Sequence, residues 1–209
     1  SDSLHKLKLV NQTIKIQSTF RIKPTSYRAG RFGQNAKGLK IIEELGYKVD
    51  SSITPLTNWG ADFRQANLEP YFPDFNNICE PGSSRVLEVP VTVDVNLPKF
   101  IKKYYRYNSE TIMAGLKYMG LKKIMLWPPI SSSKDMIKLS SRLISKKSPV
   151  INLVSHSNEL SISSSPFHKN SGDLAKYYKK LEEFFAFLKK SEIQSLTLSE
   201  FYQEYTKVS

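Results

Sequence analysis

The stretch TSYRAGRFGQNAKGLKIIEELGYKVD, residues 25–50, decides the fold of this chain. It predicts a short strand at 25–27, then a loop with two glycines, and then a helix that has Asn35 as its N-cap. Gly46 stands where this helix is expected to end, and a second short strand follows at 47–49. Strand, helix and strand in this order form a βαβ unit, which predicts parallel strands joined by a right-handed crossover.

The rest of the chain continues the alternation of strands and helices. A β-branched stretch at 86–95 predicts a strand that Pro90 interrupts, and the apolar run at 149–154 predicts a buried parallel strand. Further elements expected from apolar spacing are helices at 3–18, 109–119, 134–146, 173–190 and from Ser199, and a strand at 194–196. The whole chain, residues 1–209, is therefore expected to form a single α/β domain with parallel strands, sandwich or barrel-like.

The composition fits a folded chain with a basic surface. Its 209 residues are 40% hydrophobic and 24% charged, which allows a core and is too apolar for a disordered chain. Lysine and arginine number 31 against 19 aspartates and glutamates, and this net charge of +12 favours nucleic acid, acidic glycans or anionic surfaces as partners. The lysines are scattered in pairs, which favours a solvated surface, and no clear nucleic-acid motif is present.

Several classes of site are excluded by the residues present. Cys79 is the single cysteine, so no internal disulfide forms, and no apolar run approaches the roughly 18 residues that span a bilayer. The sequence has no phosphate-binding glycine loop, no GxSxG and no cysteine–histidine pairing that indicates a thiol nucleophile. His5, His156 and His168 offer no i, i+4 pair for a metal ion.

Polar residues follow three of the predicted strands. They occur at 28–33, at 50–52 and at 155–159. Because the carboxyl ends of parallel strands meet at one edge of a sheet, Arg28, Asp50 and His156 are candidates for one site.

A structural role stays open for each of these three residues. Arg28 can pair with a carboxylate at the rim of the sheet, and Asp50 can form a turn or cap a helix. His156 can be a hydrogen-bonded rim histidine.

Six strings resemble the middle and the end of polysaccharide deacetylases, the NodB-homology superfamily. They are SYRAGRFG at 26–33, LGYKVDSSITP at 45–55, LEVPVT at 87–92, LVSH at 153–156, SPF at 165–167 and LTLSEF at 196–201. Each string alone is weak, and it is their order along the chain that carries the resemblance. It implies a distorted (β/α) barrel and metal-dependent hydrolysis of the N-acetyl group of a sugar.

The resemblance also implies roles for particular residues. His156 would protonate the leaving amine, and Leu153 would line the pocket for the acetyl methyl group. Arg28 would hold the catalytic carboxylate through a charge-assisted hydrogen bond.

Three further residues are expected on the substrate side of the site. The backbone near Arg31 and Phe32 would lie beside the oxyanion, although this loop is one residue longer than the commonest form of the motif. Asp50 is expected to help bind the substrate, an N-acetylated polysaccharide or glycan.

The chain departs from the family in its first motifs. The Asp-Asp pair and the His-x-x-x-His-like element, which supply the base and the ligands of a divalent metal such as zinc, are absent. We therefore expect the C-terminal two-thirds of such an enzyme, an incomplete barrel that holds no metal ion of its own and is catalytically incomplete. A non-catalytic carbohydrate-binding or interaction module is the alternative.

An incomplete barrel would also leave one sheet edge unpaired. A second copy of the chain, or an N-terminal segment, is expected to cover that edge, because an exposed edge strand invites pairing with other chains. The sequence leaves the localisation open between the cytoplasm and the cell envelope.

Overall fold

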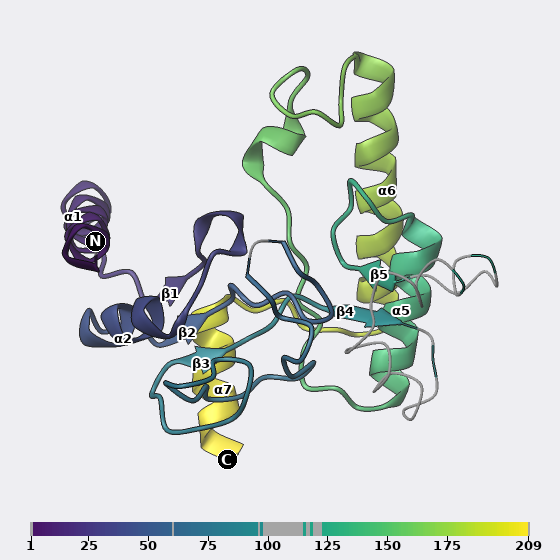
Figure 1. The fold of residues 1–209 in the computed structure, drawn as a ribbon. Helices are drawn as coiled ribbons and strands as arrows, with labels where there is room; N and C mark the ends of the chain where they lie inside the picture. Colours follow the sequence, from purple (N-terminus) through teal and green to yellow (C-terminus); the bar gives the residue numbers. More distant parts are fainter. Residues whose placement is uncertain are drawn as a thin grey trace. The chain divides into compact units, whose positions relative to one another are not determined.

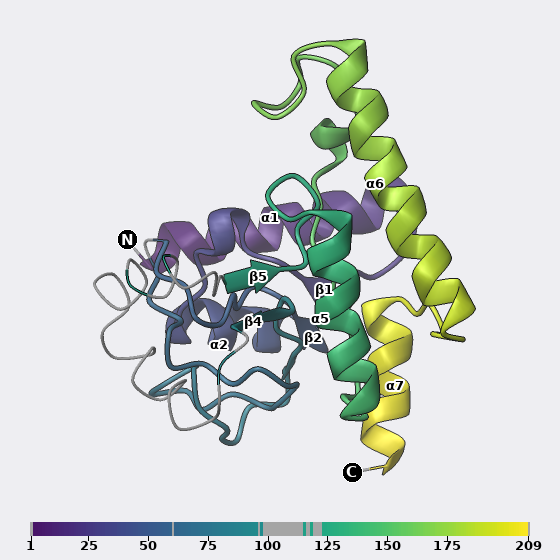
Figure 2. The same cartoon turned by 90° about the vertical axis from the view of Figure 1, so that its right-hand side faces the viewer.

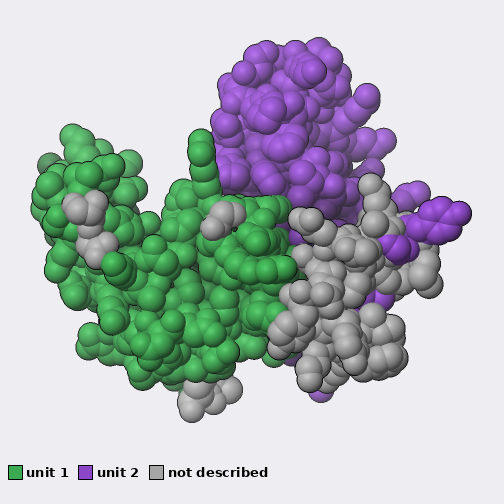
Figure 3. Space-filling view, in the orientation of Figure 1, with its two compact units in different colours: residues 1–90, 196–209 green, residues 91–195 purple. Residues whose placement is uncertain are grey.

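The computed structural model describes residues 2–59, 61–95, 97, 115, 118 and 123–208 (Figure 1). The chain divides into two compact units, coloured separately in Figure 3. Unit 1 comprises Ser1–Pro90 and Leu196–Ser209, and unit 2 comprises Val91–Ser195. The sequence predicts a single domain over residues 1–209. The two units are each defined by contacts within themselves, which does not test whether they form one domain, so the single domain stays a prediction.

The elements of unit 1 are α1 (Asp2–Phe20), β1 (Ser26–Tyr27), η1 (Gly30–Phe32), α2 (Ala36–Glu44), β2 (Val49–Asp50), β3 (Leu87–Glu88) and α7 (Leu198–Val208). The elements of unit 2 are β4 (Val93–Val95), β5 (Lys123–Met125), α5 (Ser133–Ser145), η2 (Ser157–Leu160) and α6 (Ser171–Lys190). Of the expected helix at 109–119, only residues 115 and 118 are described, and both are helical; the rest lies outside the described residues.

Unit 1 contains the predicted βαβ unit. β1, β2 and β3 form a parallel sheet with β2 in the centre, and α2 connects β1 to β2. The side chain of Asn35 accepts a hydrogen bond from the amide of Gly38, which confirms the predicted N-cap. Gly46 follows α2 with φ of +85°, a left-handed conformation that glycine adopts at little cost.

Buried apolar side chains hold unit 1 together. Ile42 on α2, Val49 on β2 and Leu87 on β3 are fully buried, and burial of each such side chain contributes roughly 1.5–3 kcal/mol. α1 packs beside α2, and the hydroxyl groups of Thr13 on α1 and Tyr47 share a hydrogen bond of 2.9 Å. Asp50 on β2 and Glu88 on β3 are buried within the same unit.

Unit 2 pairs its two strands in the opposite sense to unit 1. β4 and β5 are antiparallel, so the prediction of parallel strands throughout the chain is wrong for this pair. α5 and α6 run side by side, as Figure 2 shows, and match the predicted helices at 134–146 and 173–190. Leu126, Met136, Leu139 and Phe184 are buried completely between these elements.

Two predicted strands do not form. The backbone at 149–154 runs without a regular ladder and makes separate bonds instead, from the Val154 amide to the Leu126 carbonyl and from the Thr92 amide to the Asn152 carbonyl. The amide of Asn152 donates to the hydroxyl of Thr92, so a side chain replaces the backbone acceptor that a strand would use. The residues at 194–196 also lack strand pairing.

The described strands form a three-stranded and a two-stranded sheet. These sheets are too small to show whether the strands close into a barrel, so the distorted barrel stays a prediction. Within the described residues, no helix is both long enough and apolar enough to cross a bilayer.

Candidate functional site

Two carboxylates lie side by side inside unit 1. Asp50 on β2 is paired in register with Glu88 on β3, and each is 1% exposed. Asp50 accepts hydrogen bonds from Nε2 of Gln34 at 2.6 Å and from the hydroxyl of Ser52. Oε1 of Glu88 accepts from the amide of Ile53 at 3.0 Å. Asp50 is therefore a strand residue within a polar network, and neither a turn-former nor a helix cap.

Burial disfavours the charged form of both carboxyls. Burial raises the pKa of Asp50 to about 6, although the hydrogen bonds from Ser52 and Gln34 act in the opposite direction. Burial also raises the pKa of Glu88 well above its usual range, and the neighbouring charge of Asp50 adds to this effect. The pair therefore holds protons at a pH at which exposed carboxyls have lost them.

Arg28 lies beside these carboxyls and is held by Ser51. Its Nε donates to the Ser51 carbonyl at 2.9 Å, and its Nη2 donates to the Ser51 hydroxyl at 2.8 Å. Burial lowers the pKa of Arg28, while the charges of Glu88 and Asp50 oppose that shift. The two carboxyls thus act on the guanidinium through their charges, and the expected hydrogen bond from Arg28 to a catalytic carboxylate stays a prediction.

Arg31 and Phe32 form a tight turn after β1. Both have positive φ, 54° and 55°, in the left-handed region that non-glycine residues rarely adopt. The amide of Phe32 donates to the Ala29 carbonyl at 3.1 Å, and the Phe32 ring lies 5.9 Å from the ring of Trp59. Backbone strain of this kind is common at functional sites, but the place of Arg31 and Phe32 beside an oxyanion stays a prediction.

A second polar cluster occupies unit 2 and is centred on Glu159. This carboxylate is 1% exposed and accepts from Nε1 of Trp127 at 2.8 Å and from the Tyr177 hydroxyl at 3.1 Å. Its Oε1 also lies 3.0 Å from Nδ1 of His156, whose side chain is 54% exposed. His156 is thus a solvent-facing imidazole tied to a buried carboxylate.

Aromatic rings surround this cluster. The ring of Trp127 lies 5.8 Å from that of His156 and 5.7 Å from that of Phe167. Tyr177 contacts His168 at 4.5 Å between ring centroids, and His168 is buried without a hydrogen-bond partner for its Nε2 among the described residues. The imidazole of His156 therefore stands beside the ring of Trp127, which itself packs against Phe167.

The sequence singled out only part of this cluster. His156 is a candidate from the sequence, but the sequence assigns no role to Glu159, Trp127 or Tyr177. The i, i+3 spacing of His156 and Glu159 was the one signal available in the sequence. Leu153 is half-buried and packs against the core of unit 2, and its role toward an acetyl group stays a prediction.

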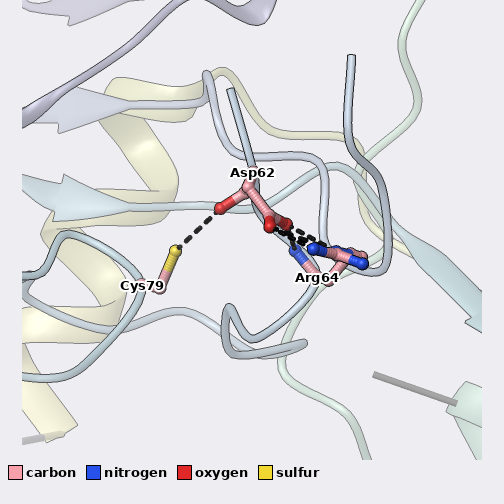
Figure 4. Close-up of polar contacts among 3 residues, drawn as sticks. All are labelled: Asp62, Arg64 and Cys79. Carbon is pink, nitrogen blue, oxygen red and sulfur yellow. Dashed lines mark hydrogen bonds and ion pairs between the residues drawn. The ribbon is translucent and has the colours of Figure 1, made fainter. Parts of the chain in front are cut away.

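Cys79 is not suited to nucleophilic chemistry. Figure 4 shows its Sγ directed at the carbonyl of Asp62, at 3.7 Å, beside the ion pair of Asp62 with Arg64. Burial raises the pKa of the Cys79 thiol to about 11, and the charge of Asp62 adds to this shift. The thiol form, which is the poor nucleophile, therefore dominates at neutral pH.

The side chains present do not fit the divalent metal that the resemblance implies. Across the described part of the chain, no three His, Cys, Asp or Glu side chains are grouped so that they could hold a metal ion. Asp50 uses its oxygens for Gln34 and Ser52, and Oε1 of Glu159 is shared by Trp127 and His156. We therefore assign no metal ligand to these residues.

The candidate residues belong to both units. Arg28, Asp50 and the turn with Arg31 and Phe32 lie in unit 1, whereas His156 lies in unit 2. The convergence of Arg28 with His156 stays a prediction. Comparisons with protein-family models, with curated proteins and with solved structures found no match.

Proposed function

We propose that this chain carries the proton-donating part of a hydrolase that removes the N-acetyl group from a sugar, as polysaccharide deacetylases do. One observation supports the proposal above the others: the half-exposed His156 is hydrogen-bonded through Nδ1 to the buried carboxylate of Glu159. An imidazole held in this way can carry a proton on Nε2, which is the nitrogen free to meet a substrate.

The chemistry assigned to His156 is general acid catalysis. Hydrolysis breaks the amide C–N bond, water supplies the oxygen of the released acetate, and the sugar amine leaves with the proton from Nε2. The ring of Trp127 lies beside the imidazole of His156, and the ring of Phe167 packs against Trp127, so the two rings offer apolar surface to the carbon face of a sugar ring. The proposal gives the chain an N-acetylated glycan as its partner, and it assigns neither the catalytic base nor a metal ligand to the described residues.

The proposal also carries the roles that the resemblance implies for residues of unit 1. Arg28 would tune a carboxylate, and the turn of Arg31 and Phe32 would approach the oxyanion. Asp50 would act through Gln34 and Ser52, because its own carboxyl is enclosed.

A non-catalytic carbohydrate-binding module is the second candidate. The burial of Asp50 and Glu88 favours it, since carboxyls that are 1% exposed and engaged in internal hydrogen bonds do not reach a substrate directly. In this case the aromatic rings around His156 would bind the sugar and no bond would be broken.

Acetate release separates the two candidates. The assay uses penta-N-acetylchitopentaose, a divalent metal, and a polypeptide that joins this chain to a segment with the Asp pair and the His-x-x-x-His element. We expect acetate release, and His156→Ala should lower the turnover about 10²–10⁴-fold. His5→Ala, on α1 in unit 1, is the matched control and should leave turnover unchanged. Sugar binding without acetate release would favour the binding module, and turnover in His156→Ala close to that of the parent would remove His156 from the mechanism.

A further inference from the structure

We infer that Glu159 is a positioning residue, which fixes the neutral imidazole of His156 with its proton on Nδ1 and leaves Nε2 facing the solvent. The catalytic meaning of this inference rests on the proposed function, but the state of the imidazole does not. The sequence places Glu159 in the polar cluster at 155–159 without a role, and its role follows from the contacts of its buried carboxylate.

Three segments of unit 2 supply partners to this carboxylate. Trp127 follows β5, Tyr177 lies on α6, and His156 is the residue that precedes η2. An indole N–H is a donor and has no acceptor, so Oε1 of Glu159 must accept from Trp127. The same Oε1 faces Nδ1 of His156 at 3.0 Å.

The partners decide where the imidazole proton lies. A carboxylate oxygen that already accepts from Trp127 can satisfy Nδ1 of His156 only as an acceptor, so Nδ1 must carry the hydrogen. A neutral imidazole carries a hydrogen on only one of its two nitrogens. With that hydrogen on Nδ1, Nε2 keeps its lone pair. When His156 is protonated, the second hydrogen is on Nε2, where a leaving amine can take it.

The backbone also restricts the positions of His156 and Glu159. The amide of Glu159 donates to the carbonyl of His156 at 2.9 Å, which closes the first turn of η2. The Tyr177 hydroxyl occupies the other oxygen, Oε2, at 3.1 Å. Because Glu159 is 1% exposed, water does not compete for its oxygens. The carboxylate therefore has little freedom to turn away from His156.

The imidazole ¹⁵N spectrum of the 209-residue chain tests this inference. The chain has three histidines, and His156→Gln assigns the signals of His156 by their loss. At a pH at which the ring is neutral, we expect protonated Nδ1 and unprotonated Nε2 for His156. A wild-type spectrum with the hydrogen on Nε2, the form preferred in water, would overturn the inference without any variant.

Three variants separate positioning from general packing. Glu159→Leu should shift His156 toward the form with the hydrogen on Nε2, provided that circular dichroism shows the helices intact. Tyr177→Phe removes only the donor to Oε2 and should keep the Nδ1–H form. Glu182→Gln, at an exposed position on α6, is the matched control and should change nothing.

Each result bears on one claim. An unchanged Nδ1–H form in folded Glu159→Leu would overturn the positioning role, because the hydrogen would then be fixed by something else. Correct hydrogen placement together with failure of acetate release would leave the inference standing and contradict the proposed function.

Discussion

Replacement of Asp50 by Asn should change the pH dependence of stability by about 3 kcal/mol. Burial raises the pKa of Asp50 from 3.8 to about 6, and each pKa unit corresponds to about 1.4 kcal/mol. Well below pH 3.8 the carboxyl is protonated in both the folded and the unfolded chain and carries no cost. As the pH rises from 3.8 to about 6, the carboxyl ionises in the unfolded chain and stays protonated in the folded chain, so the free energy of unfolding falls, and it levels off above pH 6.

Asn carries no charge at either pH and removes this pH-dependent cost. The comparison is the free energy of unfolding of Asp50→Asn minus that of the parent, measured at pH 4 and at pH 7.5. The effect of Asn on packing is the same at both pH values, so it cancels between the two differences. The variant should gain about 2.5 kcal/mol of this total relative to the parent over the interval, because the unfolded carboxyl is already partly ionised at pH 4. Glu88 is present in both proteins, and only its interaction with Asp50 affects the comparison.

Urea denaturation followed by the fluorescence of Trp59 is the suitable assay. Trp59 lies in the same unit as Asp50, and Trp127→Phe in both proteins removes the signal of unit 2. Asp62→Asn is the control of opposite sign, because Arg64 lowers the pKa of Asp62 and its ionised form stabilises the folded chain. A difference between Asp50→Asn and the parent that is equal at both pH values would refute the reasoning.

Three further predictions concern packing and reactivity. Gly46→Ala should lower the unfolding free energy by about 1–2 kcal/mol in urea denaturation, because φ is +85° there and a Cβ would meet Lys23; an unchanged midpoint would contradict this. Phe184→Ala should cost about 3–5 kcal/mol, whereas its half-exposed neighbour Phe185 should tolerate Ala far better, and equal losses would refute the assignment of the core. Cys79 should react slowly with a disulfide reagent at pH 8 and rapidly in urea, and equal rates would show that it is not buried.

The βαβ unit was predictable because its signals are local. Asn35 and Gly46 mark the two ends of α2 by their own side-chain and backbone properties, and the short strands flank that helix directly. The strand expected at 149–154 was wrong for the opposite reason. Its apolar run indicates burial but not ladder pairing, which depends on Thr92, a residue about sixty positions away.

The candidate site was predictable only in part. His156 was found because it follows an apolar run, and Asp50 because it follows a predicted strand. The cluster around Glu159 depends on contacts with Trp127 and Tyr177 that lie 32 and 18 positions away in the sequence, and no spacing rule relates them. Glu88 was missed because its strand reads as an apolar β-branched stretch, and only the register with β2 reveals a second buried carboxyl.

Titration of the 209-residue chain with an N-acetylated chito-oligosaccharide, followed by ¹⁵N NMR, tests the central claim most directly. The claim is that the aromatic surface beside His156 meets an N-acetylated sugar. We predict that the imidazole of His156 and the indole N–H of Trp127 shift together, that His5 stays unchanged, and that the same oligosaccharide without acetyl groups has a much weaker effect. Unchanged signals of His156 and Trp127 at millimolar sugar, or equal shifts with both oligosaccharides, would contradict the account.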